Sequence, residues 1–322
     1  MSASTQAPEA PARHPVRPFY WSVRRELWEN RAIYLAPLAV AGVIVLAFLY
    51  ASHGLAREVR IASGLLVAPP TPLAAGKAAA AAAKMTPAAR AGFALVVPYL
   101  ASGFAMMATA AAVGVFYALG SLYGERRDRT VLFWKSLPVS DLTTVLSKAV
   151  VPLAILPAVA IVSAGALHLI LLAWSALVLT ASGLSPGLLL DHAPVGTIWV
   201  MFAYAVASLA LWWAPITGWL MLVSAWAKRM TFLWAVTPPL AICLFERLAF
   251  GTDYAWRFLH QRLAGGLQDA FAPTPHGRGG ELSLSLIRPL QFLADPALWG
   301  GLAFAAACLA ACAWLRRRRD PI

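Results

Sequence analysis

The chain has 322 residues, of which 60% are hydrophobic and 12% are charged, and its formal net charge is +12. A soluble domain usually carries about 25% charged residues, and one soluble core could not bury this much apolar surface, so an ordinary soluble protein is excluded and an all-α protein in lipid is favoured. The cations lie in short flanks between apolar stretches, where binding to anionic lipid explains them better than binding to nucleic acid.

The first predicted elements precede any apolar stretch. Residues 1–13 are small and polar and contain Pro, which predicts a disordered cytoplasmic tail. Residues 14–31 include the run RPFYWSVRRELWENR, in which aromatic and basic residues alternate. This pattern predicts an amphipathic helix that lies on the inner face of the membrane. No cleavable signal is expected, because the first apolar run begins only after about thirty polar residues.

Six apolar segments are long enough to cross a bilayer, which takes about 20 residues per helix. We therefore predict a single six-span domain over residues 32–315. Pro157, Pro215 and the pair Pro238-Pro239 predict kinks, and the pair makes the fifth span the least regular, with two half-helices as one outcome. The second, third and fourth spans exceed the length that lipid requires, so they are expected to tilt or to extend beyond the membrane. The predicted spans are residues 32–51, 92–123, 150–181, 196–226, 230–250 and 298–315.

The connecting segments divide unequally between the two sides of the membrane. Segments 52–91 and 251–297 are long and are predicted to be external, and the Ala-rich stretch Leu73–Arg90 is expected to form a helix there. The opposite side carries more Lys and Arg in shorter segments, including the basic tail 316–322. The positive-inside rule therefore predicts that both termini are cytoplasmic.

The polar block between the second and third spans, Gly124–Lys148, is the most informative feature of the chain. Its sequence, GERRDRTVLFWKSLPVSDLTTVLSK, passes from alternating charges to an aromatic pair and then to a Pro. We predict a short helix ended by Pro138, followed by a new helix with its N-cap at Ser140 or Asp141. A solvated loop with a positive-inside signature is the simpler alternative. The order of the block instead favours a surface helix whose apolar edge docks into a groove of a cytoplasmic partner.

Two further patterns suggest other functions. Residues Gly183–Gly187 fit GxSxG and precede Asp191 and His192, the order of a hydrolase triad, but they follow an apolar helix rather than joining a strand to a helix. His168 and Glu246 are ionisable residues at membrane depth, which would suit an ion-coupled secondary carrier, although a hydrogen-bonded packing histidine is more common. A membrane-embedded serine hydrolase and an ion-coupled carrier are therefore the two alternative functions.

No metal or nucleotide site is expected in this chain. Cys243, Cys308 and Cys312 all lie in apolar stretches and are predicted to be small buried hydrophobes. Gly76-Lys77 is followed by Ala78 and lacks the upstream Gly of a P-loop. Any ATP-driven activity would therefore need another subunit.

Residues 120–148, GSLYGERRDRTVLFWKSLPVSDLTTVLSK, resemble the first cytoplasmic loop of the permeases of type-2 ABC exporters. Members of that family typically carry ERRD, LFWKSLPVS and VLSK between their second and third spans, and they share the six-span layout with internal termini. The resemblance implies that this loop is a coupling helix seated in a groove of an ATPase subunit. By position, the contact would be carried by Glu125, Arg126, Arg127, Asp128, Arg129, Phe133, Trp134, Lys135, Ser136, Leu137 and Pro138.

The same resemblance implies the function and the partners. The chain would be a transport subunit of a bacterial inner membrane, with no enzymatic activity of its own. Two permease chains, identical or paralogous, would pair with two ATPase subunits that bind ATP and Mg. The substrate is not identified by any motif, although the apolar spans suit lipid-like or amphipathic cargo.

Overall fold

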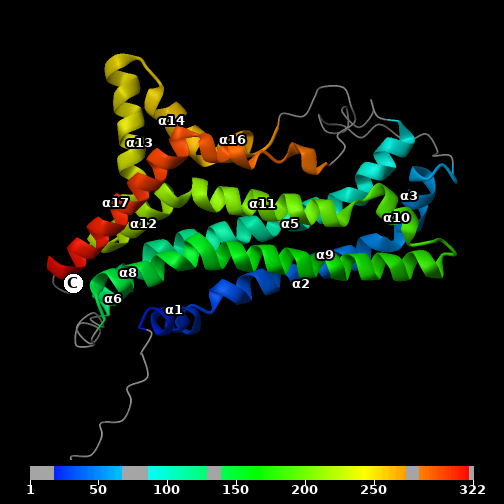
Figure 1. The fold of residues 1–322 in the computed structure, drawn as a ribbon, viewed down its shortest axis with the longest axis horizontal. Helices are drawn as coiled ribbons and strands as arrows, with labels where there is room; N and C mark the ends of the chain where they lie inside the picture. Colours follow the sequence, from blue (N-terminus) through cyan, green and yellow to red (C-terminus); the bar gives the residue numbers. More distant parts are fainter. Residues whose placement is uncertain (1–17, 67–85, 129–138, 273–282, 319–322) are drawn as a thin grey trace, which may run out of the picture.

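The computed structural model describes residues 18–66, 86–128, 139–272 and 283–318, and in these ranges the chain is helical apart from turns and one isolated β-bridge (Figure 1). Six helical segments of the described residues are long and apolar enough to cross a membrane. The prediction of an all-α, multi-pass membrane protein is thereby confirmed. The six segments are Ala32–Ala62, Arg90–Arg127, Asp141–Ala181, Val195–Trp212, Thr231–Phe250 and Pro296–Arg318.

The helices follow one another through short connections. The first half of the chain forms α1 (Pro18–Glu29), α2 (Ala32–Ala51), α3 (Leu55–Ala62), α5 (Pro87–Ser121), α6 (Tyr123–Arg127), α8 (Asp141–Val150), the π-helical turn η2 (Val151–Ile155) and α9 (Leu156–Ala181). The second half forms α10 (Gly187–His192), α11 (Val195–Trp212), α12 (Ala214–Trp226), α13 (Thr231–Phe250), α14 (Tyr254–Ala264), α15 (Gly266–Ala270), α16 (Pro289–Ala294) and α17 (Pro296–Arg318).

The centre of the molecule is a bundle in which α2, α5, α9 and α11 pack along the longest axis of the fold (Figure 1). Tyr99 and Met106 of α5 are buried there against Leu167 and Leu171 of α9. These helices are apolar all round because one face meets other helices and the other meets lipid. The core is therefore only a part of their apolar surface.

A second packing unit is the pair α12 and α17, which lie close together because small residues face one another. A Cβ atom added at Gly218 of α12 would lie 3.1 Å from the Cα of Ala305 in α17. Gly301, Ala305 and Cys308 follow at helical spacing on α17, the pattern of small residues that lets helix backbones approach. Cys308 and Cys312 are buried in this region, as predicted for small hydrophobes, whereas Cys243 on α13 is only partly buried.

Prolines affect the fourth and fifth predicted spans in opposite ways. The fourth span is divided at Trp213 into α11 and α12, with Pro215 in the first turn of α12, where a missing N–H is tolerated. In contrast, α13 is one continuous helix through Pro238 and Pro239, so the two half-helices considered as one outcome there do not form.

The third span continues as a helix into the polar block, one of the two predicted outcomes, because α8, η2 and α9 form one continuous run from Asp141 to Ala181. Ser140 is the N-cap of α8, as predicted, and its Oγ accepts a hydrogen bond from the backbone N–H of Thr143 at 3.1 Å.

Helix α13 is almost wholly exposed and points away from the bundle, and α14 to α16 then lead back towards α11 (Figure 1). The indole Nε1 of Trp212, in α11, donates a hydrogen bond to the backbone oxygen of Arg262 at 3.1 Å. The Arg262 guanidinium stacks over the same indole ring at 4.5 Å. The segment predicted as external therefore packs on the junction of α11 and α12. Most of the Ala-rich stretch 73–90 lies outside the described residues.

Candidate functional site

Charged side chains from several helices meet at the end of the bundle where α1, α6 and the carboxyl end of α17 lie (Figure 1). We call this group the ion cluster. It consists of Arg25 and Glu26 of α1, Tyr117 of α5, Glu125 of α6, Asp141 and Lys148 of α8, and Arg316 of α17.

Lys148 is the most deeply buried cation of the ion cluster, and its side chain is 3% exposed. Its ammonium Nζ lies 2.8 Å from Oε1 of Glu26 and 3.2 Å from Oε1 of Glu125. Glu26 is 2% exposed, and its second oxygen accepts a hydrogen bond from the Tyr117 hydroxyl at 2.8 Å. Both carboxylates thus share one buried ammonium.

Glu125 connects the largest number of helices in the ion cluster. Besides Lys148, it accepts a hydrogen bond from Nη2 of Arg25 at 3.1 Å and a short one from Nη1 of Arg316. The Nε of Arg316 also donates to Oδ1 of Asp141 at 2.9 Å. One carboxylate on the short helix α6 therefore links α1, α8 and α17.

Such a cluster is costly to break. Removing charges from water costs several kcal/mol per ion, and only good geometry with further hydrogen bonds compensates for that cost. Here three carboxylates face three cations, so the buried charge is balanced. We infer that the ion cluster fixes the relative positions of α1, α6, α8 and α17 more firmly than exposed ion pairs could.

Arg126 attaches α6 to the end of α12. Its Nη2 donates to the backbone oxygens of Ser224 at 2.8 Å and of Ala227 at 2.6 Å. A guanidinium at this position complements the carbonyls and the negative dipole of a helix carboxyl end. The Ser224 Oγ in turn accepts the backbone N–H groups of Leu122 and Tyr123. The turn between α5 and α6 is therefore attached to the end of α12 both by the Arg126 side chain and by its own backbone N–H groups.

The residues predicted to contact a partner divide into two groups in the described part of the chain. Glu125 and Arg126 are each 8% exposed and bond to other parts of this chain. Arg127 and Asp128 are exposed and pair with each other, with 2.9 Å between Nε and Oδ1. The other predicted contact residues, Arg129, Phe133, Trp134, Lys135, Ser136, Leu137 and Pro138, lie outside the described residues.

The members of the ion cluster belong to separate features of the sequence. Lys148 ends the polar block, Arg316 begins the basic tail, and Glu26 lies in the predicted amphipathic helix. A usable signal was present, because the chain has only 14 Asp and Glu residues. Glu26, Glu125 and Asp141 each lie beside a long apolar helix, where an acidic residue has few ways to be solvated.

The hydrolase pattern does not assemble in the described structure. The Ser185 Oγ accepts the N–H of Gly187 at 3.3 Å. The ring nitrogens of His192 lie within 2.8 Å of the Leu188 oxygen and 3.1 Å of the Ala62 oxygen. Because both nitrogens engage backbone carbonyls, His192 is not arranged to act as a base for Ser185.

The two residues considered for an ion-coupled carrier have local structural partners. Nε2 of His168 is buried, 2.9 Å from the oxygen of Tyr99 and 3.1 Å from the Oγ of Ser102. The Glu246 carboxylate accepts the backbone N–H groups of Tyr254 and Ala255, at the start of α14. His168 therefore acts in packing, and Glu246 caps a helix.

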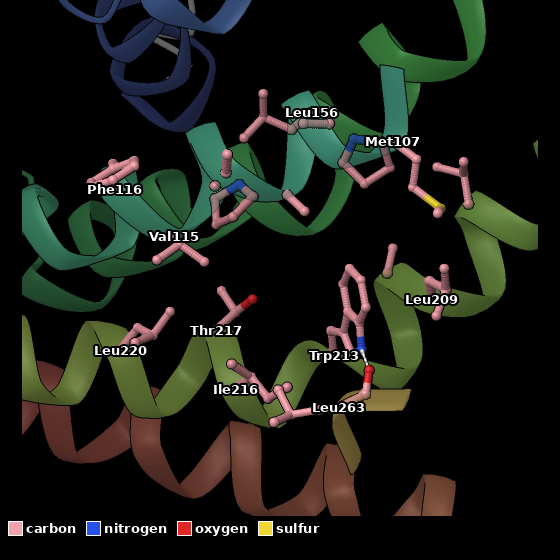
Figure 2. Close-up of a pocket in the computed structure, with 18 residues that line it drawn as sticks. Met107, Val115, Phe116, Leu156, Leu209, Trp213, Ile216, Thr217, Leu220 and Leu263 are labelled. Atoms are coloured by element: carbon pink, nitrogen blue, oxygen red, sulfur yellow. Dashed lines mark hydrogen bonds between the residues drawn. The ribbon is translucent and has the colours of Figure 1, made fainter. Parts of the chain in front are cut away.

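An elongated apolar cavity of about 370 Å³ lies further along the bundle, between α5, η2 and the start of α9, and α11 and α12 (Figure 2). Its walls include Met107, Val115, Leu156, Leu209 and Leu220. We call it the apolar cavity.

In comparisons with protein families, with curated proteins and with solved structures, nothing matches this chain.

Proposed function

We propose that this chain is the permease subunit of an ATP-driven exporter of the type-2 ABC kind, which works as a dimer with separate ATPase subunits. The observation that carries the proposal is the ion cluster formed by the helices that flank residues 129–138 in the sequence. These residues connect α6 to α8, and both helices belong to the cluster. The sequence of the loop resembles the coupling helix of that family, and six candidate spans supply a membrane domain.

The ion cluster would carry motion from the loop into the membrane domain. A push on the loop acts on α6 and α8, and α8 continues without interruption through η2 into α9. Glu125 and Asp141 bind Arg316, so the carboxyl end of α17 would move with them. Packed interiors respond to such a push by switching between discrete arrangements rather than by deforming smoothly.

The docking edge of the loop follows from its sequence. Phe133, Trp134 and Leu137 fall at i, i+1 and i+4, so on a helix they form one apolar edge. In this proposal the edge inserts into a pocket of the ATPase. Glu125 and Arg126 are buried in the molecule, and the exposed Arg127 and Asp128 would lie nearer to the partner.

The substitution Trp134→Ala tests the proposal. Truncation of an aromatic anchor commonly costs about 2 kcal/mol or more of binding free energy. We expect the variant to lose co-purification with an ATPase subunit encoded next to it and to lose stimulation of ATP hydrolysis, while membrane insertion is unchanged. The matched control is Arg127→Ala, since an exposed ion pair contributes only about 0–1 kcal/mol.

The comparison is made at equal expression, because a misfolded permease would imitate an uncoupled one. If Trp134→Ala binds the ATPase and stimulates hydrolysis like the wild type, the loop is not the coupling element. If the purified chain hydrolyses ATP on its own, with contaminating ATPases excluded, the proposal that a separate subunit hydrolyses ATP is wrong.

A further inference from the structure

The lining of the apolar cavity extends along several turns of helix. On α5 its lining extends from Met107 to Phe116, nine residues apart, which corresponds to about 14 Å along a helix. The lining on α11 and α12 extends from Val206 to Leu220, fourteen residues apart, which corresponds to about 21 Å of helix. The lining therefore follows the helices over a length that suits an extended chain.

The chemistry of the lining selects an apolar ligand. Among the described residues that form it, only the side chains of Trp213 and Thr217 carry a nitrogen or oxygen atom. The Trp213 Nε1 already donates a hydrogen bond to the backbone oxygen of Leu263 at 3.2 Å (Figure 2). A cavity without polar partners does not hold ordered water, and an apolar guest is its natural occupant.

The bilayer around these helices contains apolar ligands of this kind. The cavity lies between candidate membrane spans, and Phe116 at its edge is 72% exposed. Acyl chains are the solvent around these helices. We propose that the apolar cavity is a binding site for one acyl chain of a membrane phospholipid. With about 1.25 Å of length per extended C–C bond, calculated from standard bond lengths and angles, the lining would hold about 11 methylenes.

The π-helical turn η2 gives this site a connection to the ion cluster. Pro152 of η2 lines the cavity, and Lys148 lies four residues before it in the same helical run. Single π-helical turns are often found at functional sites, and they can shift register against an α-helix. An acyl chain against Pro152 and Leu156 would favour one register over the other. Occupancy of the cavity would thus change the position of Lys148 in the ion cluster.

Lipid binding here does not depend on the proposed export function. The inference requires only that these helices lie in a bilayer, so its test uses no ATPase and no transport assay. The results of the Trp134→Ala experiment therefore neither support nor damage it.

The test fills the cavity with a larger side chain, placed on α5 in one variant and on α11 in another. Ala111 of α5 and Ala210 of α11 line it, and Ala111→Phe or Ala210→Phe would put a ring where the chain would lie. The matched controls are Ala108→Phe and Ala207→Phe, at exposed positions on the same two helices outside the lining. All four proteins and the wild type are placed in phosphatidylcholine nanodiscs that contain a fraction of phosphatidylcholine with a diazirine near the end of one acyl chain.

Irradiation and peptide mapping by mass spectrometry then report where the chain lies. We expect the wild type and both controls to be labelled at cavity residues such as Met107 and Trp213. Labelling there should fall about tenfold in the two filled variants, while labelling of the exposed α13 is unchanged. Thermal unfolding confirms that each variant is folded, and either filled variant alone is sufficient. Equal cavity labelling in filled variants and controls overturns the inference, and so does a wild-type protein labelled on α13 but not in the cavity.

Discussion

The ion cluster and the apolar cavity occupy the same helices and are filled in opposite ways. In the cluster, side chains of α1, α5, α6, α8 and α17 form ion pairs and hydrogen bonds with one another, and Lys148 is 3% exposed. In the cavity, α5, α9, α11 and α12 enclose about 370 Å³ that no side chain of the described chain fills. Buried charged groups are stable only beside partners of opposite charge in fixed positions. Apolar side chains in a bilayer can instead be covered by lipid.

Along α8 and η2 the two regions are separated by a single turn of helix, and on α5 Tyr117 of the cluster directly follows Phe116 of the cavity lining. Lys148 ends the cluster on α8, and η2 begins at Val151. A stiff region next to an adaptable turn and an unfilled space is a suitable arrangement for a hinge, because the helices beside the cavity can shift into that space. The comparison predicts that substitutions in the cluster will cost much more stability than substitutions of the same helices beside the cavity.

The largest effect is expected for Lys148→Met. The substitution keeps an unbranched side chain, one atom shorter, but leaves Glu26 and Glu125 without the ammonium they share. Breaking a buried pair in this way commonly costs about 3–5 kcal/mol. We expect lower yield and a clearly lower unfolding temperature in detergent, measured by intrinsic fluorescence.

A second substitution separates lost charge balance from lost packing. Glu26→Gln in the Lys148→Met background removes the excess negative charge, so it should restore part of the stability. Arg127→Ala breaks an exposed pair and should change the unfolding temperature little. If Lys148→Met unfolds at the same temperature as Arg127→Ala, the ion cluster is not a rigid element and the comparison fails.

The sequence predicted the features that depend on neighbours in the chain. Apolar runs gave six spans, and Ser140 followed by Asp141 gave the N-cap of α8. Proline chemistry was less reliable, because tertiary and local context decide whether a helix breaks, as at Trp213, or continues, as at Pro238 and Pro239.

The ion cluster could not be predicted in this way. Arg316 and Glu125 are 191 residues apart, and Lys148 and Glu26 are 122 residues apart, so neither pair leaves a periodic pattern. The apolar cavity is a property of how four helices fit together, and every residue that lines it would suit a lipid-facing position equally well.

A smaller effect is expected on the closely packed face of α12. An added Cβ at Gly218 would lie 3.1 Å from the Cα and 3.2 Å from the oxygen of Ala305, and both atoms belong to the backbone of α17. Because backbone atoms cannot rotate away, Gly218→Ala should push the two helices apart at a cost of about 1–3 kcal/mol. The control is Gly42→Ala in α2, where nothing lies within 4 Å of the new atom. Equal unfolding temperatures for the two variants would show that α12 and α17 are not tightly packed.

The smallest effect is expected for Gly114→Ala on the cavity wall, and its sign is opposite to that of Gly218→Ala. The new Cβ would meet the Cδ1 of Leu156 at 3.5 Å and the Cβ of Pro152 at 3.8 Å, which are ordinary contacts. Alanine is favoured over glycine inside a helix by about 1 kcal/mol, and here no clash opposes that gain. Gly114→Ala should therefore raise the unfolding temperature slightly, while Gly218→Ala lowers it. If Gly114→Ala also destabilises the protein, the wall beside η2 is already close-packed, and the space ascribed to a lipid chain is smaller than the structure indicates.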